Sequence, residues 1–121
     1  ANGYYEWRKI DNQKQPYLIS IPRNELLFFG AIWRIEIRNN KQTNVACIIT
    51  KAANQKLSYI HDRMPLIMSH NEGLSFLNDN NNNFLKKNQS IIEDDFDYYP
   101  VSKIVNNPKN NDLNCLKEIT L

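Results

Sequence analysis

Three ionisable side chains of different chemistry stand next to one another in the segment His61-Asp62-Arg63. A histidine donates or accepts a proton near neutral pH, and the planar guanidinium of an arginine suits a phosphate or a carboxylate. The neighbouring segments 45–50 and 66–68 are largely apolar, so the three groups lie between core-forming elements. This pattern is typical of a catalytic or anion-binding site. The alternative is an Asp62–Arg63 surface ion pair beside a structural histidine, and it stays open here.

A carboxylate lies among aromatic side chains near the start of the chain, in Tyr4-Tyr5-Glu6-Trp7-Arg8. In a strand, alternate side chains point to opposite faces, so Tyr4, Glu6 and Arg8 share one face. Aromatic neighbours favour a protonated acid, whereas the cation favours the carboxylate, and a group between these influences suits general acid/base catalysis. The alternatives are an ion pair with Arg8 for Glu6 and core packing for Trp7.

The bulk composition allows one domain or a large part of one. The chain has 121 residues, of which 41% are hydrophobic, and its mean hydropathy is −0.61. A formal net charge of +2 does not by itself indicate a nucleic-acid partner. The cations are nevertheless grouped locally, at Arg8-Lys9, Arg34, Arg38 with Lys41, and Lys86-Lys87.

The two cysteines predict neither a disulfide framework nor a zinc site. Cys47 lies in an apolar run and is expected to be buried, Cys115 lies in a polar tail, and neither belongs to a Cys-x-x-Cys pair. The acidic cluster 93–95 lacks regular ligand spacing, so we expect a solvated loop there, no metal and no cofactor. No apolar run is long enough to span a membrane, and the expected compartment is the cytoplasm.

Strand-like and turn-like segments alternate along the chain and predict an α+β fold dominated by antiparallel sheet, with short helices. Strands are expected at residues 3–9, 16–21, 26–38, 44–50, 66–68 and 96–102. Turns or loops are expected at 11–14, 22–25, 39–42 and 79–83, and short helices at 52–60, after Ser69 and at 84–87.

The long strand at 26–38 changes its pattern partway. Residues 26–29 are apolar on both faces and should be buried on both sides. Further on, Trp33, Ile35 and Ile37 alternate with charged residues. They should form the buried face of a strand whose other face is exposed to solvent.

The helix after Ser69 has a recognisable start. Glu72 stands three residues later, which is the spacing of a capping box. With this start, Leu74 and Leu77 are expected to face the core.

Six motifs follow one another along the chain. They are Asn2-Gly3-Tyr4-Tyr5-Glu6-Trp7, Lys14-Gln15-Pro16-Tyr17, Phe29-Gly30-Ala31-Ile32-Trp33, Ile48-Ile49-Thr50, Ile60-His61-Asp62-Arg63-Met64-Pro65 and Tyr99-Pro100-Val101-Ser102. This series resembles the SRAP family, the SOS response-associated peptidases. The resemblance runs from the first residue to about the last ten, and the motifs are specific in combination.

The resemblance implies a compact β-rich fold and a DNA-repair protein that attaches covalently to abasic sites in single-stranded DNA. The family's nucleophile is a cysteine at the mature N-terminus, and the half of the domain that carries it is absent from this sequence. Residues 1–121 therefore look like the C-terminal portion of a single SRAP-like domain. The implied partners are abasic single-stranded DNA and a companion chain or segment carrying the N-terminal half, at the nucleoid and with no membrane.

The resemblance also implies roles for five residues. The family's cysteine closes its amine and its thiol onto the aldehyde carbon of the opened sugar to form a thiazolidine, which requires several proton transfers. Glu6 would be the acid/base that helps open the sugar, and His61 would assist at the leaving oxygen. Arg63 and Thr50 would contact the phosphate backbone, and Trp7 would shape the DNA cleft.

Whether the chain is an enzyme by itself stays open. The family also removes its own initiator methionine with the same cysteine, and neither Cys47 nor Cys115 can replace that residue. Crosslinking, which is lyase-like, and thiol autopeptidase activity are therefore expected only with the N-terminal half. The alternative is a half-domain that binds single-stranded DNA through Trp7 and Arg63 without covalent chemistry.

Overall fold

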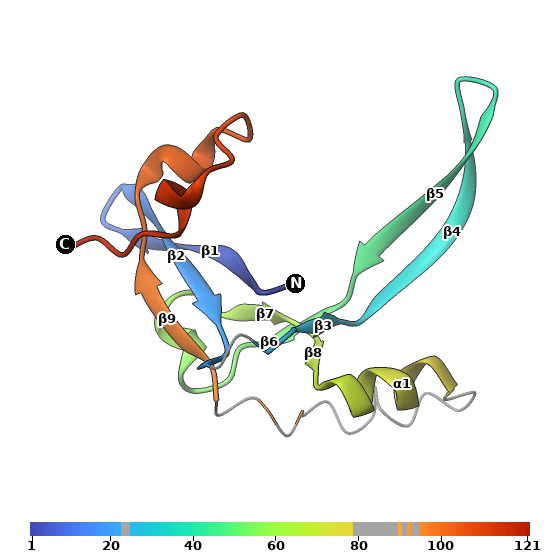
Figure 1. Ribbon diagram of the computed structural model, residues 1–121, viewed down its shortest axis with the longest axis horizontal. Helices are drawn as coiled ribbons and strands as arrows, with labels where there is room; N and C mark the ends of the chain where they lie inside the picture. The colour runs from blue at the N-terminus through green and yellow to red at the C-terminus, as the bar shows by residue number, and fades with distance from the viewer. Residues whose placement is uncertain (23–24, 79–89, 91, 93–94) are drawn as a thin grey trace.

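The computed structural model describes residues 1–22, 25–78, 90, 92 and 95–121 (Figure 1). Within them, all strand pairs are antiparallel and the helical elements are short, which confirms the β-rich α+β prediction. The strands are β1 (Gly3–Ile10), β2 (Gln13–Ser20), β3 (Phe28–Phe29), β4 (Ala31–Arg38), β5 (Lys41–Ile48), β6 (Thr50–Ala52), β7 (Arg63–Pro65), β8 (Ile67–Met68) and β9 (Asp97–Pro100). The helices are η2 (Leu57–Tyr59), α1 (His70–Asn78), η3 (Lys103–Asn106) and η4 (Leu113–Leu116).

Four predicted features lie wholly or partly outside the described residues. They are the turn at 22–25, the loop at 79–83, the helix at 84–87 and the acidic cluster at 93–95.

Two tight hairpins are made by Asn and Asp, which tolerate the left-handed backbone region better than most residues. Asp11, in the turn between β1 and β2, has a φ of 52°. Between β4 and β5, Asn39 and Asn40 have φ values of 51° and 59°. Two consecutive positive φ values fit a type I′ turn, whose twist matches that of the flanking strands.

The Gln15-Pro16 motif holds β9 against β2. The three-stranded sheet has the order β1-β2-β9, and Val101, just after β9, donates its N–H to the Pro16 carbonyl at 3.0 Å. Pro16 has no N–H to return to the Val101 carbonyl. The side-chain amide of Gln15 donates to that carbonyl instead, at 2.8 Å, and to the Pro16 carbonyl at 2.9 Å. Gln15 is buried for this reason.

Three two-stranded ladders meet at a ring of backbone hydrogen bonds. Gly30 donates to the Leu66 carbonyl at 2.8 Å, Leu66 to the Ile49 carbonyl at 2.8 Å, and Ile49 to the Gly30 carbonyl at 2.9 Å. These residues lie between β3 and β4, β7 and β8, and β5 and β6. A Cβ on Gly30 would come within 2.8 Å of the Leu66 Cδ2 atom, so the close approach requires glycine.

The ribbon of β4 and β5 projects away from the rest of the described chain (Figure 1). Its predicted buried face is exposed: the exposed fractions of Trp33, Ile35 and Ile37 are 69%, 55% and 76%. The prediction was wrong because alternation separates two faces without determining whether a partner covers either one. Leu26 is likewise exposed, whereas Leu27 is buried.

The two cysteines also reverse their predicted environments. Cys47 is exposed because it lies on the projecting ribbon, and Cys115 is buried within η4. The Cys115 thiol donates to the Asn110 carbonyl at 3.6 Å.

The helix α1 begins with the predicted capping box. Ser69 donates its N–H to Glu72 Oε2 at 2.9 Å, and Glu72 donates its N–H to Ser69 Oγ at 3.3 Å. The inward positions of Leu74 and Leu77 were predicted wrongly, because both are exposed and the helix faces Phe28 with Gly73 instead.

The main core lies between the β1-β2-β9 sheet and the segments around η2 and β7. Its buried members are Tyr17, Ile19, Ile21, Leu27, Leu57, Ile60, Met64, Ile67, Ile92 and Phe96. Of the segment 52–60, where a short helix was expected, residues Leu57–Tyr59 form η2, and Leu57 and Ile60 are buried. None of the helices among the described residues has the length and apolar content of a membrane-spanning helix.

Replacing Gln15 with leucine tests the role of its side-chain amide. The substitution keeps the volume but leaves the buried Val101 carbonyl without its donor, so we expect a loss of about 1–3 kcal/mol in the free energy of unfolding. Chemical denaturation measures this difference. The exposed Gln55→Leu change is the control, expected within about 0.5 kcal/mol of wild type. Equal denaturation midpoints for both variants would contradict the assigned role.

Candidate functional site

The two predicted acid/base residues meet at one open cleft. This cleft has a volume of about 500 Å³. Its lining residues are Glu6, Trp7, Lys9, Lys14, Ile60, His61 and Asn106. The fold thus brings Glu6, on the first strand, to the same cavity as His61, just before β7.

Glu6 is held at the open edge of the sheet. The register pairs Trp7 with Pro16, whose carbonyl already accepts from Val101 on the other side. The Trp7 N–H therefore faces away from β2, and Glu6 Oε1 accepts it at 3.0 Å. Within the described residues, Glu6 Oε2 accepts no hydrogen bond. One carboxylate oxygen thus fixes the side chain, and the other remains available for proton transfer.

The indole of Trp7 forms part of the cleft wall. Its Nε1–H donates to the Asn106 Oδ1 atom at 2.8 Å, and the side chain is partly exposed. The core-packing alternative for Trp7 is therefore wrong. Sequence reasoning missed Asn106, because the contact joins residues 99 positions apart and no local pattern connects them.

Arg8 does not pair with Glu6. Its guanidinium carbon lies 3.6 Å from the centroid of the Tyr59 ring, and Nη1 donates to the Tyr59 hydroxyl. This cation–π contact holds Arg8 on η2, so the predicted Glu6–Arg8 ion pair does not form. The charge of Glu6 remains available at the cleft.

His61 is oriented by the backbone that follows it. Its Nδ1 atom accepts the Arg63 N–H at 3.0 Å, and Asp62 Oδ1 lies 3.0 Å from the same nitrogen. A backbone N–H can only donate, so the neutral ring carries its proton on Nε2. These two contacts fix the orientation of the imidazole.

Arg63 and Thr50 lie together on the β6–β7 ladder. The Arg63 Nη2 atom donates to the Thr50 carbonyl at 2.8 Å and to Thr50 Oγ1 at 2.7 Å. The alternative of an Asp62–Arg63 surface pair is wrong, because Asp62 contacts His61 and Arg63 contacts Thr50. The exposed guanidinium and hydroxyl form a compact donor group directly after His61.

The tyrosines near the site keep their protons near neutral pH. Burial, with a smaller contribution from the Glu6 charge, raises the pKa of Tyr4 well above its usual value. Burial also raises the pKa values of Tyr5 and Tyr99, whose hydroxyls donate to carbonyls of η4. The three tyrosine hydroxyls are therefore not suited to proton transfer near neutral pH.

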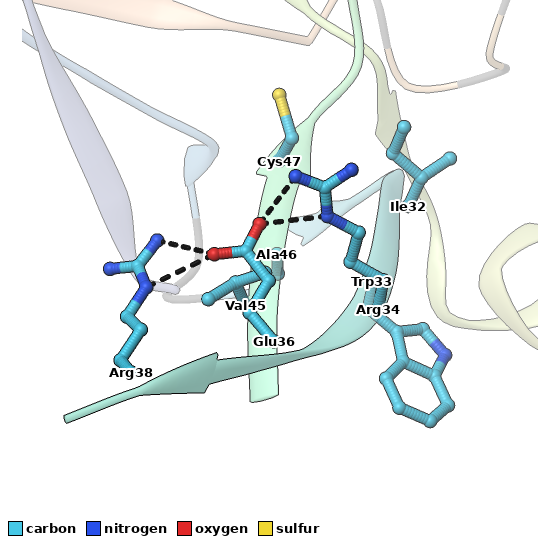
Figure 2. Close-up of a pocket in the computed structure, with 8 residues that line it drawn as sticks. All are labelled: Ile32, Trp33, Arg34, Glu36, Arg38, Val45, Ala46 and Cys47. Carbon is cyan, nitrogen blue, oxygen red and sulfur yellow. Dashed lines mark hydrogen bonds and ion pairs between the residues drawn. The ribbon is translucent and has the colours of Figure 1, made fainter. Parts of the chain in front are cut away.

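A second hollow, of about 400 Å³, lies on the ribbon and contains none of the predicted site residues. Figure 2 shows its charged side, where Glu36 accepts from both Arg34 and Arg38. Cys47 lies on this side and Trp33 on the opposite one (Figure 2). Among the described residues, no cluster of His, Cys, Asp and Glu could hold a metal ion.

The model of the family described as "SOS response associated peptidase (SRAP)" matches residues 1–108. The chain belongs to the SRAP family. The abasic site processing protein YoaM of Bacillus subtilis is 33% identical over 96% of this chain and 53% of its own length. YedK of Escherichia coli is 27% identical over 98% of this chain and 55% of its own length. HMCES of Xenopus tropicalis is 29% identical over 100% of this chain and 42% of its own length.

The comparison with solved structures supports the SRAP-like fold. A crystal structure of a protein from Bacteroides thetaiotaomicron superimposes with a TM-score of 0.82 at 20% identity. The match covers 98% of this chain and 55% of that chain. The chain thus spans about half the length of the curated relatives it matches.

Proposed function

We propose that this chain supplies the proton-transfer and phosphate-binding part of a SRAP domain that crosslinks to abasic sites in single-stranded DNA. The observation that carries this proposal is the shared cleft of Glu6 and His61. The proposed nucleophile is an N-terminal cysteine on a polypeptide corresponding to the half that this chain does not cover. The assembled domain would also remove its own initiator methionine as a thiol peptidase.

The chemistry needs proton transfer at several steps. The cysteine amine adds to the sugar aldehyde and water leaves, which forms a carbon–nitrogen double bond. The thiolate then adds to that carbon, the thiol proton passes to the nitrogen, and the thiazolidine ring closes. The free Oε2 atom of Glu6 is suited to exchange protons at the nitrogen, and His61 at the sugar's leaving oxygen. Arg63 and Thr50 would bind a neighbouring phosphate.

Neither cysteine of this chain is placed for the nucleophilic step. Cys47 lies on the ribbon and Cys115 is buried in η4, and neither lines the cleft. The competing function, noncovalent binding of single-stranded DNA, is favoured by this lack of a thiol at the cleft. Incubation with an abasic oligonucleotide and intact-mass analysis distinguish the two, since only crosslinking adds the mass of DNA to a polypeptide.

The ribbon provides a surface for the companion half. On one face the register places Trp33 opposite Ala46, and Ile35, Ile37 and Ile48 lie on the same face, where Asn44 and Gln42 are opposite Ile35 and Ile37. All five apolar residues are exposed. An isolated two-stranded ribbon with an uncovered apolar face is at best marginally stable in water. The relatives are about twice as long as this chain. We therefore assign this face to contact with the N-terminal half of the domain.

Charged substitutions test this assignment. The double variant Ile35→Lys/Ile37→Lys should abolish association with the N-terminal half, because the introduced ammonium groups cannot be buried without a partner. Sedimentation velocity of the mixed polypeptides measures the complex. The control Thr43→Lys lies on the opposite face, across from Glu36, and should associate normally. Association of the double variant that equals wild type would rule this face out as the contact.

Replacing Glu6 with glutamine tests the acid/base role. The amide oxygen can still accept the Trp7 N–H, so the cleft keeps its shape while proton exchange at this position is lost. We expect crosslink formation by the assembled domain to slow by about 10²–10⁴-fold with DNA binding retained. Gel-resolved time courses measure the rate, with the exposed Glu25→Gln as control. Wild-type rates in the Glu6 variant would remove it from the mechanism.

Replacing Arg63 with alanine tests the phosphate contact. Loss of one phosphate contact should weaken single-strand binding and reduce the slope of log K against log salt by about 0.7. Fluorescence anisotropy across a salt series measures both. The control is Arg34→Ala, which removes one positive charge at a position on the charged side of the ribbon, away from the cleft. Binding by the Arg63 variant that equals wild type at every salt concentration would rule the contact out.

A further inference from the structure

We propose that Lys9 and Lys14 form a second phosphate-binding pair, which holds the backbone of a single strand at the cleft separately from Arg63 and Thr50. The inference rests on the proposed function, which supplies the class of ligand, a single strand of DNA. Its independent basis is the placement of the two lysines on the β1–β2 hairpin, where each directly faces the other.

The register places the two lysines directly opposite each other. Trp7 and Pro16 form a non-hydrogen-bonded pair, because the Pro16 carbonyl faces β9 and accepts from Val101. Antiparallel pairs alternate in type, so the Lys9–Lys14 pair, two positions along, is also of the non-hydrogen-bonded type. Side chains in such pairs are closest, with Cβ atoms about 4.5–5.5 Å apart, and like charges in direct opposition are destabilising. A bound anion would relieve this repulsion.

The neighbouring cations already have partners, whereas these two do not. Arg8 lies over Tyr59, and Lys103 donates to Gln13 Oε1 at 2.7 Å. Among the described residues, neither Lys9 nor Lys14 forms an ion pair or a side-chain hydrogen bond. Both are exposed and both line the cleft. Their charges therefore act on the cleft without a direct ion-pair partner among the described residues, although the Glu6 carboxylate lines the same cleft.

The surroundings fit a nucleic-acid strand better than a small anion. Trp7 lies on the same face of the hairpin as Lys9, and Asn106 holds its indole in place as a flat surface for a base. Lys9 follows Glu6 by three positions, which is about 10 Å along a strand. The cleft is open, so a polymer can pass through it. Flexible lysines bind phosphate as point charges, without reading sequence.

The test compares paired alanine variants of the protein in binding an unmodified single-stranded oligonucleotide. Lys9→Ala/Lys14→Ala should bind about tenfold more weakly at low salt, and its slope of log K against log salt should fall by about 1.4, which is about 0.7 for each lost phosphate contact. Lys41→Ala/Lys117→Ala removes the same charge from the ribbon tip and the C-terminal tail and should keep the wild-type slope. Lys9→Arg/Lys14→Arg should restore both affinity and slope.

Each outcome decides between the inference and the function on which it rests. A wild-type slope in the Lys9→Ala/Lys14→Ala variant would overturn the phosphate pair while leaving the proposed function intact. An equal loss in the Lys41/Lys117 control would also overturn it, because a general field would then explain the binding. A wild-type protein that does not bind the oligonucleotide would overturn both. Matching thermal unfolding of the variants shows that the fold is unchanged.

Discussion

The geometry of this chain depends on the backbone hydrogen-bond ring of Gly30, Ile49 and Leu66. Each of its three bonds links two different two-stranded ladders, so small units that would be marginal alone become one framework. The ring tolerates no side chain at Gly30. Thr50 directly follows one ring residue, and Arg63 begins the strand that leads to another. Their contact is thus a consequence of how the ladders meet.

The β1–β2 hairpin positions Glu6, on the other side of the site, through its backbone pairing. Because the Pro16 carbonyl faces β9 and accepts from Val101, the paired Trp7 turns its N–H toward the open edge, where Glu6 accepts it. Gln15 supplies the donor that Pro16 lacks on the β9 side. Pro16 thus requires a buried amide at the preceding position, and the hydrogen bond that holds Glu6 depends on the side to which Pro16 faces.

The open edge of β1 and the bare face of the ribbon are features of the same kind. Both leave groups exposed that strands usually cover, backbone donors in one case and Trp33, Ile35 and Ile37 in the other. Both agree with a chain that spans about half the length of its SRAP relatives. Glu6, Thr50 and Arg63 lie on paired strands and His61 lies just before one, whereas neither cysteine lines the cleft.

Local patterns in the sequence determined the strand at 3–9, the capping box of Ser69 and Glu72, and the motifs that indicate the family, because each depends on neighbouring residues. They also singled out Glu6 and His61, which line one cleft in the structure. Only the tertiary structure decided that Arg8 stacks on Tyr59 and that Trp7 bonds Asn106. It also decided which apolar residues are covered. Contacts between distant positions and the presence of a covering partner leave no periodic signal in the chain.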